Sequence, residues 1–404
     1  MKISFQYLIL IMFFGCTTQL QGQQKLRFVT DFPAGNILID RVSNDTVHLR
    51  PDLRDTEGNW FYWYFAVKGA SGKNLVFQFN GKQSLAAFGP AVSMDQGKTW
   101  KWLFDKPSGR SSFAYSFPAS QSEVRFSMGM PYTQSNLETF LHKHQKNSFV
   151  KVGTLCTTNK GRAVEKITIS QPAGEAALYK VLITARHHAC EMMASYELEG
   201  IIEAVLSRDK EMKWLRENVA FMIIPFMDKD GVENGDQGKN RKPRDHNRDY
   251  SGTSVYATTA ALRKEIPEWS EGKLEIGLDL HCPYINGKDH ESIHIVGSGK
   301  PEVAATQRKF SSILEKNIKG ELAFNEGSNF LAHGTSWNKS SNTSQGMSFS
   351  QWVSTIETVS LPMTIEFPYA INNGEMITPE NARAFGRDVA YAVARYLQGL
   401  DKGH

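Results

Sequence analysis

The sequence is poor in cysteine, nearly balanced in charge and almost without long apolar runs, and each shortage excludes a class of protein. Four cysteines among 404 residues are too few for a disulfide scaffold or a set of zinc fingers. The 46 Lys and Arg residues against 42 Asp and Glu leave a net charge of +4, which argues against a nucleic acid as partner. Hydrophobic residues at 41% and charged residues at 22% exclude a disordered or collagen-like chain. A length of 404 residues instead predicts a globular protein of two domains.

A long apolar run is found at the N-terminus. Lys2 is followed by the nearly unbroken apolar run Ile3–Phe14, and small and polar residues come next. This pattern is typical of an export signal, so we expect a signal peptide over residues 1–22 and a periplasmic or secreted protein. A lipoprotein anchored at Cys16 is the alternative. No later stretch approaches the ~18 apolar residues of a membrane span, so we expect no transmembrane segment.

The first part of the mature chain has the pattern of an all-β domain. Aromatic and β-branched runs such as Trp60–Val67 and Asn74–Phe79 alternate with turn signals, among them Lys68–Gly72 and Ser93–Lys98. Short strands at this spacing, without long helices between them, indicate an antiparallel β-sandwich. We place this domain at residues 23–135.

In residues 136–404, apolar strands alternate with helices. Glu191–Leu206 has apolar residues at helical spacing, and Thr378 with Pro379 marks the start of a closing helix. This alternation predicts an α/β domain whose mixed, largely parallel sheet is flanked by helices. The strands expected in that sheet are Tyr179–Thr184, Val219–Ile224, Leu274–Leu280 and Met363–Ile365.

Residue types that bind metals stand at the ends of three of these strands. His188 follows the first strand and precedes Glu191 by three residues. His281 follows the third strand, and Glu366 follows the fourth. Because sites in parallel α/β sheets gather at the carboxyl ends of strands, these side chains are expected to converge. Two histidines and a glutamate are a ligand set for catalytic zinc. Taken singly, each is better explained as a core histidine or a salt-bridge partner, but together they favour a zinc site.

A second histidine pair offers a competing metal site. His290 to His294 reads His-Glu-Ser-Ile-His, the zinc-protease string, which requires a helix so that both histidines share a face. Asn286-Gly287 before the string and Gly297 after it favour a strand or a loop. On a strand the two histidines would lie about 13 Å apart, which is too far to share an ion. We therefore reject this string as the metal site.

Five short segments of the second domain combine into one pattern. In order, they are His188-Ala189-Cys190-Glu191, Asp228-Lys229-Asp230-Gly231, Asp245-His246-Asn247-Arg248, Asp279-Leu280-His281 and Thr364-Ile365-Glu366. Together they resemble the funnelin zinc carboxypeptidases, and most closely their cytosolic carboxypeptidase branch. The segments Trp60–Tyr62 and Pro131–Thr133 resemble the β-sandwich that precedes the catalytic domain in that branch. The resemblance therefore covers nearly the whole mature chain.

The resemblance implies a zinc carboxypeptidase-like fold and a metal site. His188, Glu191 and His281 would bind one zinc ion. Glu366 would be the general base or acid for the water that the ion activates. Asp245 would accept a hydrogen bond from a ligand histidine and fix its tautomer.

The resemblance also implies residues that bind the substrate. Asn247 and Arg248 would hold its terminal carboxylate, a role that suits the planar guanidinium group. An arginine of the family polarises the scissile carbonyl, and we prefer Arg241 over Arg244 for this role. The position of the family's mobile tyrosine is vacant, or it is filled by another tyrosine of the chain. The candidates for that tyrosine are Tyr284 and Tyr369. Whether Cys190 and Cys282 form a disulfide also stays open.

The function expected from these patterns is an exported zinc-dependent metallocarboxypeptidase that hydrolyses the C-terminal peptide bond of peptides or proteins. One alternative is a zinc amidase or deacylase of the same fold, acting on acylated amino acids or cell-wall peptides. Another is a non-catalytic protein that binds glycans or peptides. The sequence specifies neither the residue that is removed nor the oligomeric state.

Overall fold

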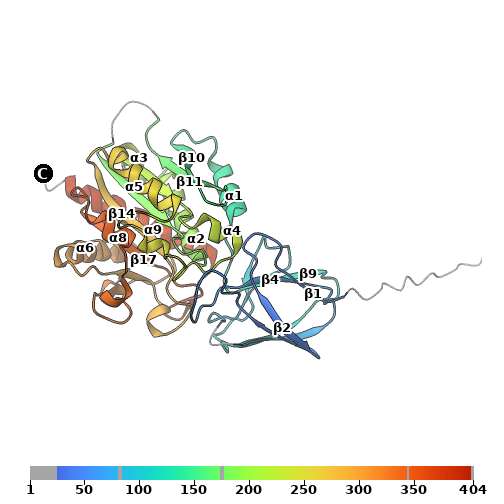
Figure 1. The fold of residues 1–404 in the computed structure, drawn as a ribbon. Coiled ribbons are helices and arrows are strands. Elements are labelled where there is room, and N and C mark those ends of the chain that lie inside the picture. The colour runs from blue at the N-terminus through green and yellow to red at the C-terminus, as the bar shows by residue number, and fades with distance from the viewer. Residues whose placement is uncertain (1–24, 81–83, 173–176, 344, 402–404) are drawn as a thin grey trace, which may run out of the picture.

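The computed structural model describes residues 25–80, 84–172, 177–343 and 345–401 (Figure 1). The expected signal peptide and Cys16 lie outside these residues. A β-rich N-terminal unit precedes an α/β unit along the chain, and Figure 1 shows the two side by side. The expected boundary after residue 135 falls in the first turn of α1 (Gln134–His144).

The N-terminal unit consists of two β-sheets. All described strand pairs in it are antiparallel except one. The exception is the pair of β3 and β5, which run parallel with Thr46 beside Val76. The five-stranded sheet has the order β1 (Arg27–Val29), β4 (Tyr64–Lys68), β9 (Glu123–Ser127), β6 (Ala91–Ser93) and β7 (Lys101–Trp102). The four-stranded sheet has the order β2 (Leu38–Ser43), β3 (Thr46–Arg50), β5 (Asn74–Phe79) and β8 (Ser112–Ser116).

Aromatic rings fill the space between these two sheets. Phe126 of the five-stranded sheet lies 5.3 Å, between ring centroids, from both Phe77 and Phe113 of the four-stranded sheet. In β5, Leu75 and Phe79 are buried like Phe77, while the residues between them are more exposed. Because burial alternates from residue to residue, one face of the strand points inward, and the expected sandwich is confirmed.

The α/β unit is built on an eight-stranded mixed sheet. Its central strands β13, β12, β14 and β17 run parallel, whereas β11 joins β13, and β15 joins β17, in the antiparallel sense. The prediction of a mixed, largely parallel sheet is thus confirmed. The strand order is β10 (Val150–Thr157), β11 (Ala163–Ile169), β13 (Val219–Ile224), β12 (Tyr179–Ala185), β14 (Leu274–His281), β17 (Leu361–Glu366), β15 (His294–Val296) and β16 (Phe330–Leu331).

Helices cover both faces of this sheet, because its central strands are apolar on both sides. In β12, Val181 and Ile183 belong to one buried cluster with α2, α6 and α9, while Leu182 belongs to a second cluster with α5 and α8. Within the described residues, no helix has the length and apolar character needed to cross a membrane. The helices are α2 (Met192–Val205), α3 (Lys210–Asn218), α4 (Lys229–Asn234), α5 (Ala257–Ser270), α6 (Pro301–Asn317), α7 (Glu326–Asn329), α8 (Phe349–Val353) and α9 (Pro379–Asp401). Short elements complete the unit, namely η1 (His246–Arg248), η2 (Lys288–His290), η3 (Ser340–Thr343), β18 (Ile371–Asn372) and β19 (Glu375–Met376).

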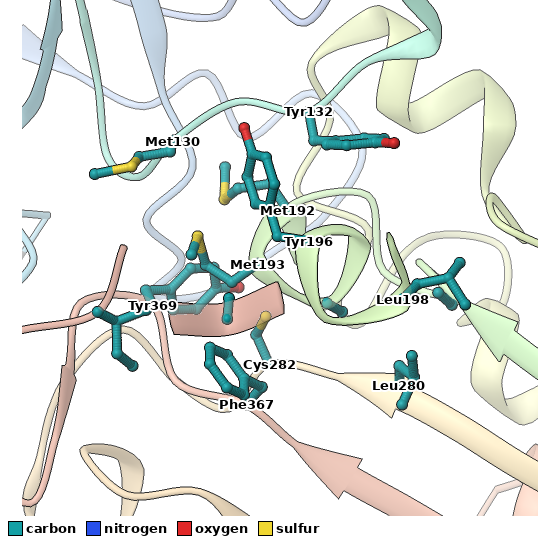
Figure 2. Close-up of a cluster of buried hydrophobic side chains, with 14 of the residues drawn as sticks. Met130, Tyr132, Met192, Met193, Tyr196, Leu198, Leu280, Cys282, Phe367 and Tyr369 are labelled. Carbon is teal, nitrogen blue, oxygen red and sulfur yellow. The ribbon is translucent and has the colours of Figure 1, made fainter. Parts of the chain in front are cut away.

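The two units share one hydrophobic core. Met130 and Tyr132, in the segment that links the units, pack over α2, and the Tyr132 ring lies 5.1 Å from that of Tyr196 (Figure 2). Phe61 of the N-terminal unit contacts Tyr369 of the α/β unit at 5.6 Å between ring centroids. Because burial of apolar surface is the main favourable term in folding, this contact couples the stability of the two units.

Helices α2 and α9 approach each other closely and enclose a carboxyl group. A Cβ atom at Gly200 would lie 2.0 Å from the Arg383 carbonyl oxygen, and one at Gly386 would lie 2.0 Å from the Glu197 carbonyl oxygen. The Glu197 side chain is fully buried, and neither of its oxygens has a hydrogen-bond partner among the described residues. Burial raises the pKa of Glu197 well above its usual value.

We expect Glu197→Met to stabilise the protein, and more so at pH 8 than at pH 5. The unfolded carboxyl group is ionised at pH 8, so folding must take up a proton at Glu197. The buried carboxyl group therefore destabilises the folded protein more and more as the pH rises from the unfolded pKa toward the raised folded pKa. A gain of about 1–3 kcal/mol in the free energy of unfolding is expected at pH 8. Urea denaturation at both pH values measures it, with Glu321→Met on the exposed surface as the control. Equal gains at pH 5 and pH 8 would contradict the expectation.

Candidate metal and catalytic site

The residues predicted as zinc ligands lie together at one edge of the central sheet. His281, the last residue of β14, is beside Glu366, the last residue of β17, in their parallel register. His188 lies in the loop after β12, and Glu191 directly precedes α2. One ligand atom from each of His188, Glu191 and His281 lies within 4.8 Å of the others. The order β12-β14-β17 in the sheet brings these residues to one point.

Both histidines present the same ring nitrogen to a shared carboxylate. Nδ1 of His188 lies 2.9 Å from Oε1 of Glu191, and Nδ1 of His281 lies 2.9 Å from Oε2. The carboxylate and His281 are buried, and His188 borders the cleft described below. Two imidazole nitrogens and a carboxylate around one point are the protein donor set of a catalytic zinc site.

The opposite ring nitrogens are held by two further carboxylates. Nε2 of His188 lies 3.1 Å from both oxygens of Asp245, and Nε2 of His281 lies 2.6 Å from Oδ2 of Asp279. Ionised carboxylates only accept hydrogen bonds, so Asp245 and Asp279 can each hold a proton on the Nε2 that faces them, which would leave each Nδ1 lone pair for an ion bound beside Glu191. The donor set and the carboxylates behind it therefore fit a zinc ion.

These outer carboxylates stay charged despite their burial. Burial opposes the charge of Asp245, but His188 and Arg248 outweigh it and hold the pKa of Asp245 well below its usual range. Burial likewise opposes the charge of Asp279, and His187 with His281 lowers its pKa. Each carboxylate thus remains an acceptor over the whole physiological pH range.

A hydrogen-bonded chain behind His281 contains residues that the sequence patterns did not single out. Oδ1 of Asp279 accepts from Nδ1 of His187 and from the Thr184 hydroxyl, both at 2.8 Å. The Tyr250 hydroxyl lies 2.6 Å from Nε2 of His187, to which it donates. The available signal was the position of Asp279 two residues before His281, on the same face of β14. The chain orients Asp279 and, through it, the His281 ring.

Glu366 borders a large cleft beside the predicted ligands. The cleft has a volume of about 1560 Å³, and His188, Asn247 and Arg248 also line it. Oε2 of Glu366 is buried without a hydrogen-bond partner in the described part of the chain. Burial raises the pKa of Glu366, although Lys239 and His281 oppose the shift. A carboxyl group with a raised pKa is suited to exchange protons near neutral pH.

Asn247 and Arg248 occupy the same cleft but make different contacts. Oδ1 of Asn247 accepts from the Phe349 backbone N–H at 2.8 Å, and its Nδ2 lies 3.0 Å from Nε2 of His281. Nη1 of Arg248 donates to the Asn247 carbonyl oxygen at 2.6 Å, and Arg248 borders the cleft. Both residues border the cleft, so their expected role in holding a substrate carboxylate stays a prediction, and the Asn247 amide also supports the start of α8.

The two arginines considered for the scissile carbonyl are engaged elsewhere. Arg241 pairs with Asp228 at 2.5 Å, with Asp236 at 3.0 Å and with Asp55 at 3.6 Å. Arg244 pairs with Asp249 at 2.9 Å. The role expected for Arg241 stays a prediction. In these contacts its guanidinium ties the turn at Asp228 to the N-terminal unit.

Lys239 is a site residue that the sequence patterns missed. Its ammonium group hydrogen-bonds to the carboxylate of Glu191 and to the Cys282 carbonyl oxygen, the latter at 2.8 Å. Burial opposes its charge, but the carboxylates of Glu191 and Glu366 outweigh burial and raise the pKa of Lys239. Lys239 borders the same cleft as Glu366. The sequence placed it in a basic loop, where its neighbours in space could not be read.

The competing string does not form a metal site among the described residues. His290 ends the short η2 and His294 begins β15, so the two never share a helical face. The His290 ring stacks on Trp337 at 6.0 Å, and His294 pairs with Glu366 across the antiparallel strands β15 and β17. Neither belongs to a group of possible metal ligands in the part of the chain that the structure describes.

The open questions about cysteine and tyrosine have structural answers. Cys190 and Cys282 are both buried and unpaired. The Tyr369 hydroxyl is buried 3.3 Å from Sγ of Cys190, whereas Tyr284 borders the cleft and donates to the Asn59 carbonyl oxygen at 2.8 Å. Of the two tyrosines considered, Tyr284 is the one at the cleft.

Solved structures of bacterial metallo-carboxypeptidases share this fold. The metallo-carboxypeptidase from Burkholderia cenocepacia is similar with a TM-score of 0.74 and 20% identity, over 93% of this chain and 100% of that one. The metallo-carboxypeptidase from Pseudomonas aeruginosa, solved with (2-guanidinoethylmercapto)succinic acid, gives the same TM-score and identity over 93% and 100%.

Curated relatives are cytosolic carboxypeptidases. Cytosolic carboxypeptidase 6 of Caenorhabditis elegans is 29% identical over 65% of this chain and 63% of its own. Cytosolic carboxypeptidase 3 of Mus musculus is 30% identical over 74% of this chain, which spans a third (33%) of that relative. The family described as zinc carboxypeptidase matches residues 137–393. The chain therefore belongs to the zinc carboxypeptidase family.

Proposed function

We propose that this protein is a metallocarboxypeptidase that uses one zinc ion to hydrolyse the C-terminal peptide bond of peptides or proteins. The observation that carries the proposal is that the three metal donors lie together beside one cleft, which is lined by His188, Arg248 and Glu366, and that Oε2 of Glu366 is buried there without a hydrogen-bond partner among the described residues. A metal site, a proton acceptor and a group that recognises an anionic chain end are what the reaction needs.

Each residue has a distinct role in this proposal. His188, Glu191 and His281 would hold zinc, which supplies a Lewis acid that activates water and polarises the scissile carbonyl. Arg248 binds the terminal carboxylate and so aligns the last peptide bond with the site. Glu366 takes a proton from the attacking water at Oε2 and delivers it to the leaving amine.

We further propose that the protein is exported, either released after a signal peptide over residues 1–22 or anchored by a lipid at Cys16. Lys2 and the apolar run behind it support this proposal. The curated relatives are cytosolic by name, so the compartment would distinguish this chain from them. Determining the N-terminal residue of the protein purified from its cells, with mass spectrometry for an acyl group, tests both forms.

Peptides with a free C-terminus should be shortened by one residue at a time, and the same peptides with an amidated C-terminus should resist. The reason is that Arg248 recognises a carboxylate, which the amide lacks. Arg248→Ala should raise KM for the peptides with a free C-terminus about 10–100-fold. Arg248→Lys should recover only part of this loss, because lysine keeps the positive charge but cannot bind a carboxylate in a bidentate manner. Mass spectrometry of the products, with and without a chelator, measures the reaction.

Lys300→Ala provides the control, because Lys300 also borders the cleft, where its ammonium group lies 3.4 Å from the Ser354 hydroxyl. It should leave KM unchanged. Cleavage of amidated peptides at the same rate, or of acylated amino acids in place of peptides, would replace the proposal with the amidase alternative.

A further inference from the structure

The Lys239 ammonium group occupies the reaction centre and not the protein surface. Its side chain is only 12% exposed, and it lies against Glu191 and the Cys282 carbonyl oxygen. Repulsion between Lys239 and the nearby Arg241 is small, because three carboxylates pair with the Arg241 guanidinium. Glu191 and Cys282 account for two of the three N–H donors of the ammonium within the described residues. One donor is left to meet a group in the cleft.

The backbone that carries Lys239 is fixed on both sides. Gly238 has φ +81°, and a Cβ atom there would lie 2.3 Å from the Ala189 nitrogen, so only glycine fits beside the His188 loop. The Asp55 carboxylate accepts from the Gln237 and Gly238 N–H groups at 3.1 and 2.8 Å. This segment is therefore built to hold the following side chain in one place.

Contacts from the N-terminal unit complete the support. The Thr56 hydroxyl donates to the Lys239 carbonyl oxygen at 2.8 Å. Oε1 of Gln237 accepts from the backbone N–H groups of Phe61 and Tyr62 at 3.1 and 2.9 Å. A long, flexible lysine side chain thus extends from a rigid backbone, which reduces the entropy lost when it meets a substrate.

We propose that Lys239 is a catalytic residue that stabilises the negative charge developing on the scissile carbonyl oxygen, the role that the sequence predicts for Arg241. The inference rests on the proposed function. As the water oxygen bonds to the carbonyl carbon, the π electrons move to the carbonyl oxygen, and the ammonium donates a hydrogen bond to it. The water proton passes to Glu366 and then to the amine nitrogen as the C–N bond breaks and the carbonyl re-forms. Such a preorganised donor in a buried site is a strong source of rate enhancement.

A purely structural role for Lys239 makes a different prediction. In that case Lys239 only positions the buried Glu191 carboxylate through its hydrogen bond, and its loss would weaken zinc binding while substrate and transition-state mimics lost affinity equally. A catalytic role requires the opposite pattern, in which zinc stays bound and the mimic of the transition state loses more affinity than the substrate does.

The test compares Lys239→Met and Lys239→Arg with the unaltered protein. Zinc content is measured first by atomic emission. Calorimetry then measures the affinity for a phosphinic pseudopeptide with a free C-terminus, which mimics the tetrahedral centre. The affinity for the matching uncleaved peptide is measured in the Glu366→Gln background, with and without Lys239→Met.

We expect Lys239→Met to keep its zinc, to lose about 100-fold or more in affinity for the phosphinic peptide, and to change peptide affinity less than about 3-fold. Lys239→Arg should recover part of the loss. Loss of zinc, or equal weakening of both ligands, would overturn the inference. If the unaltered protein cleaves peptides and Lys239→Met matches it, this inference alone fails. If the unaltered protein, loaded with zinc, neither cleaves peptides nor binds the phosphinic ligand, the proposed function fails as well.

Discussion

Glu366→Gln is expected to lower kcat by about 10³-fold or more while the protein keeps its zinc. The amide has the size of the carboxyl group but cannot take a proton from water, and general acid–base catalysis contributes about 10²–10⁴ in rate. Zinc stays because Glu366 lies on β17, outside the group formed by His188, Glu191 and His281. Single-turnover assays with a free-ended peptide, alongside metal analysis of the same sample, measure both effects.

Glu291→Gln is the matched control. Glu291 is the glutamate of the zinc-protease string and pairs with Arg110 at 2.7 Å, away from the predicted ligands. If that string were the active site, Glu291 would be its base, so the two variants separate the two sites. Activity that survives Glu366→Gln and vanishes in Glu291→Gln would transfer catalysis to the string.

His188→Ala is expected to abolish stable zinc binding and, with it, turnover. A catalytic zinc site has three protein ligands, and Nδ1 of His188 is one of the three donors here. The loss should exceed that of Asp279→Asn, which removes only a partner behind His281 and is expected to cost about 10–100-fold in zinc affinity. Competition with a fluorescent chelator ranks the two affinities.

His290→Ala should bind zinc as the unaltered protein does, since His290 stacks on Trp337 and belongs to no metal-ligand group within the described residues. The contrary result, zinc lost in His290→Ala but kept in His188→Ala, would show that the ligands have been misassigned. The pair of alanine variants removes one imidazole each, so a general loss of stability cannot explain a difference in zinc alone.

That the candidate zinc ligands lie together could be predicted from the sequence, because their positions follow from strand ends. Each strand of the parallel core is a short apolar run, and the polar residue that ends it is visible without any knowledge of the fold. Parallel strands place those ends at one edge, so His188, His281 and Glu366 meet by topology.

The contacts of Arg241 and Lys239 could not be predicted in that way. Both lie in one basic loop, and what separates them is which carboxylates they reach in space. Arg241 meets Asp55, which is 186 residues away in the sequence, whereas Lys239 meets Glu191, 48 residues away. Charge pattern alone favours neither partner. The parallel pairing of β3 with β5 was missed for a similar reason, since local turn signals predict only neighbours joined by a hairpin.

Dividing the chain between its units would remove more than a structural support. Asp55 and Thr56 belong to the N-terminal unit, yet they hold the backbone that carries Lys239. An isolated α/β unit would still contain all three metal donors, but the backbone at Lys239 would lose its hydrogen bonds to Asp55 and Thr56 and become more mobile. The N-terminal unit thus positions a residue of the candidate site through the hydrogen bond between the Asp55 carboxylate and the Gly238 N–H group.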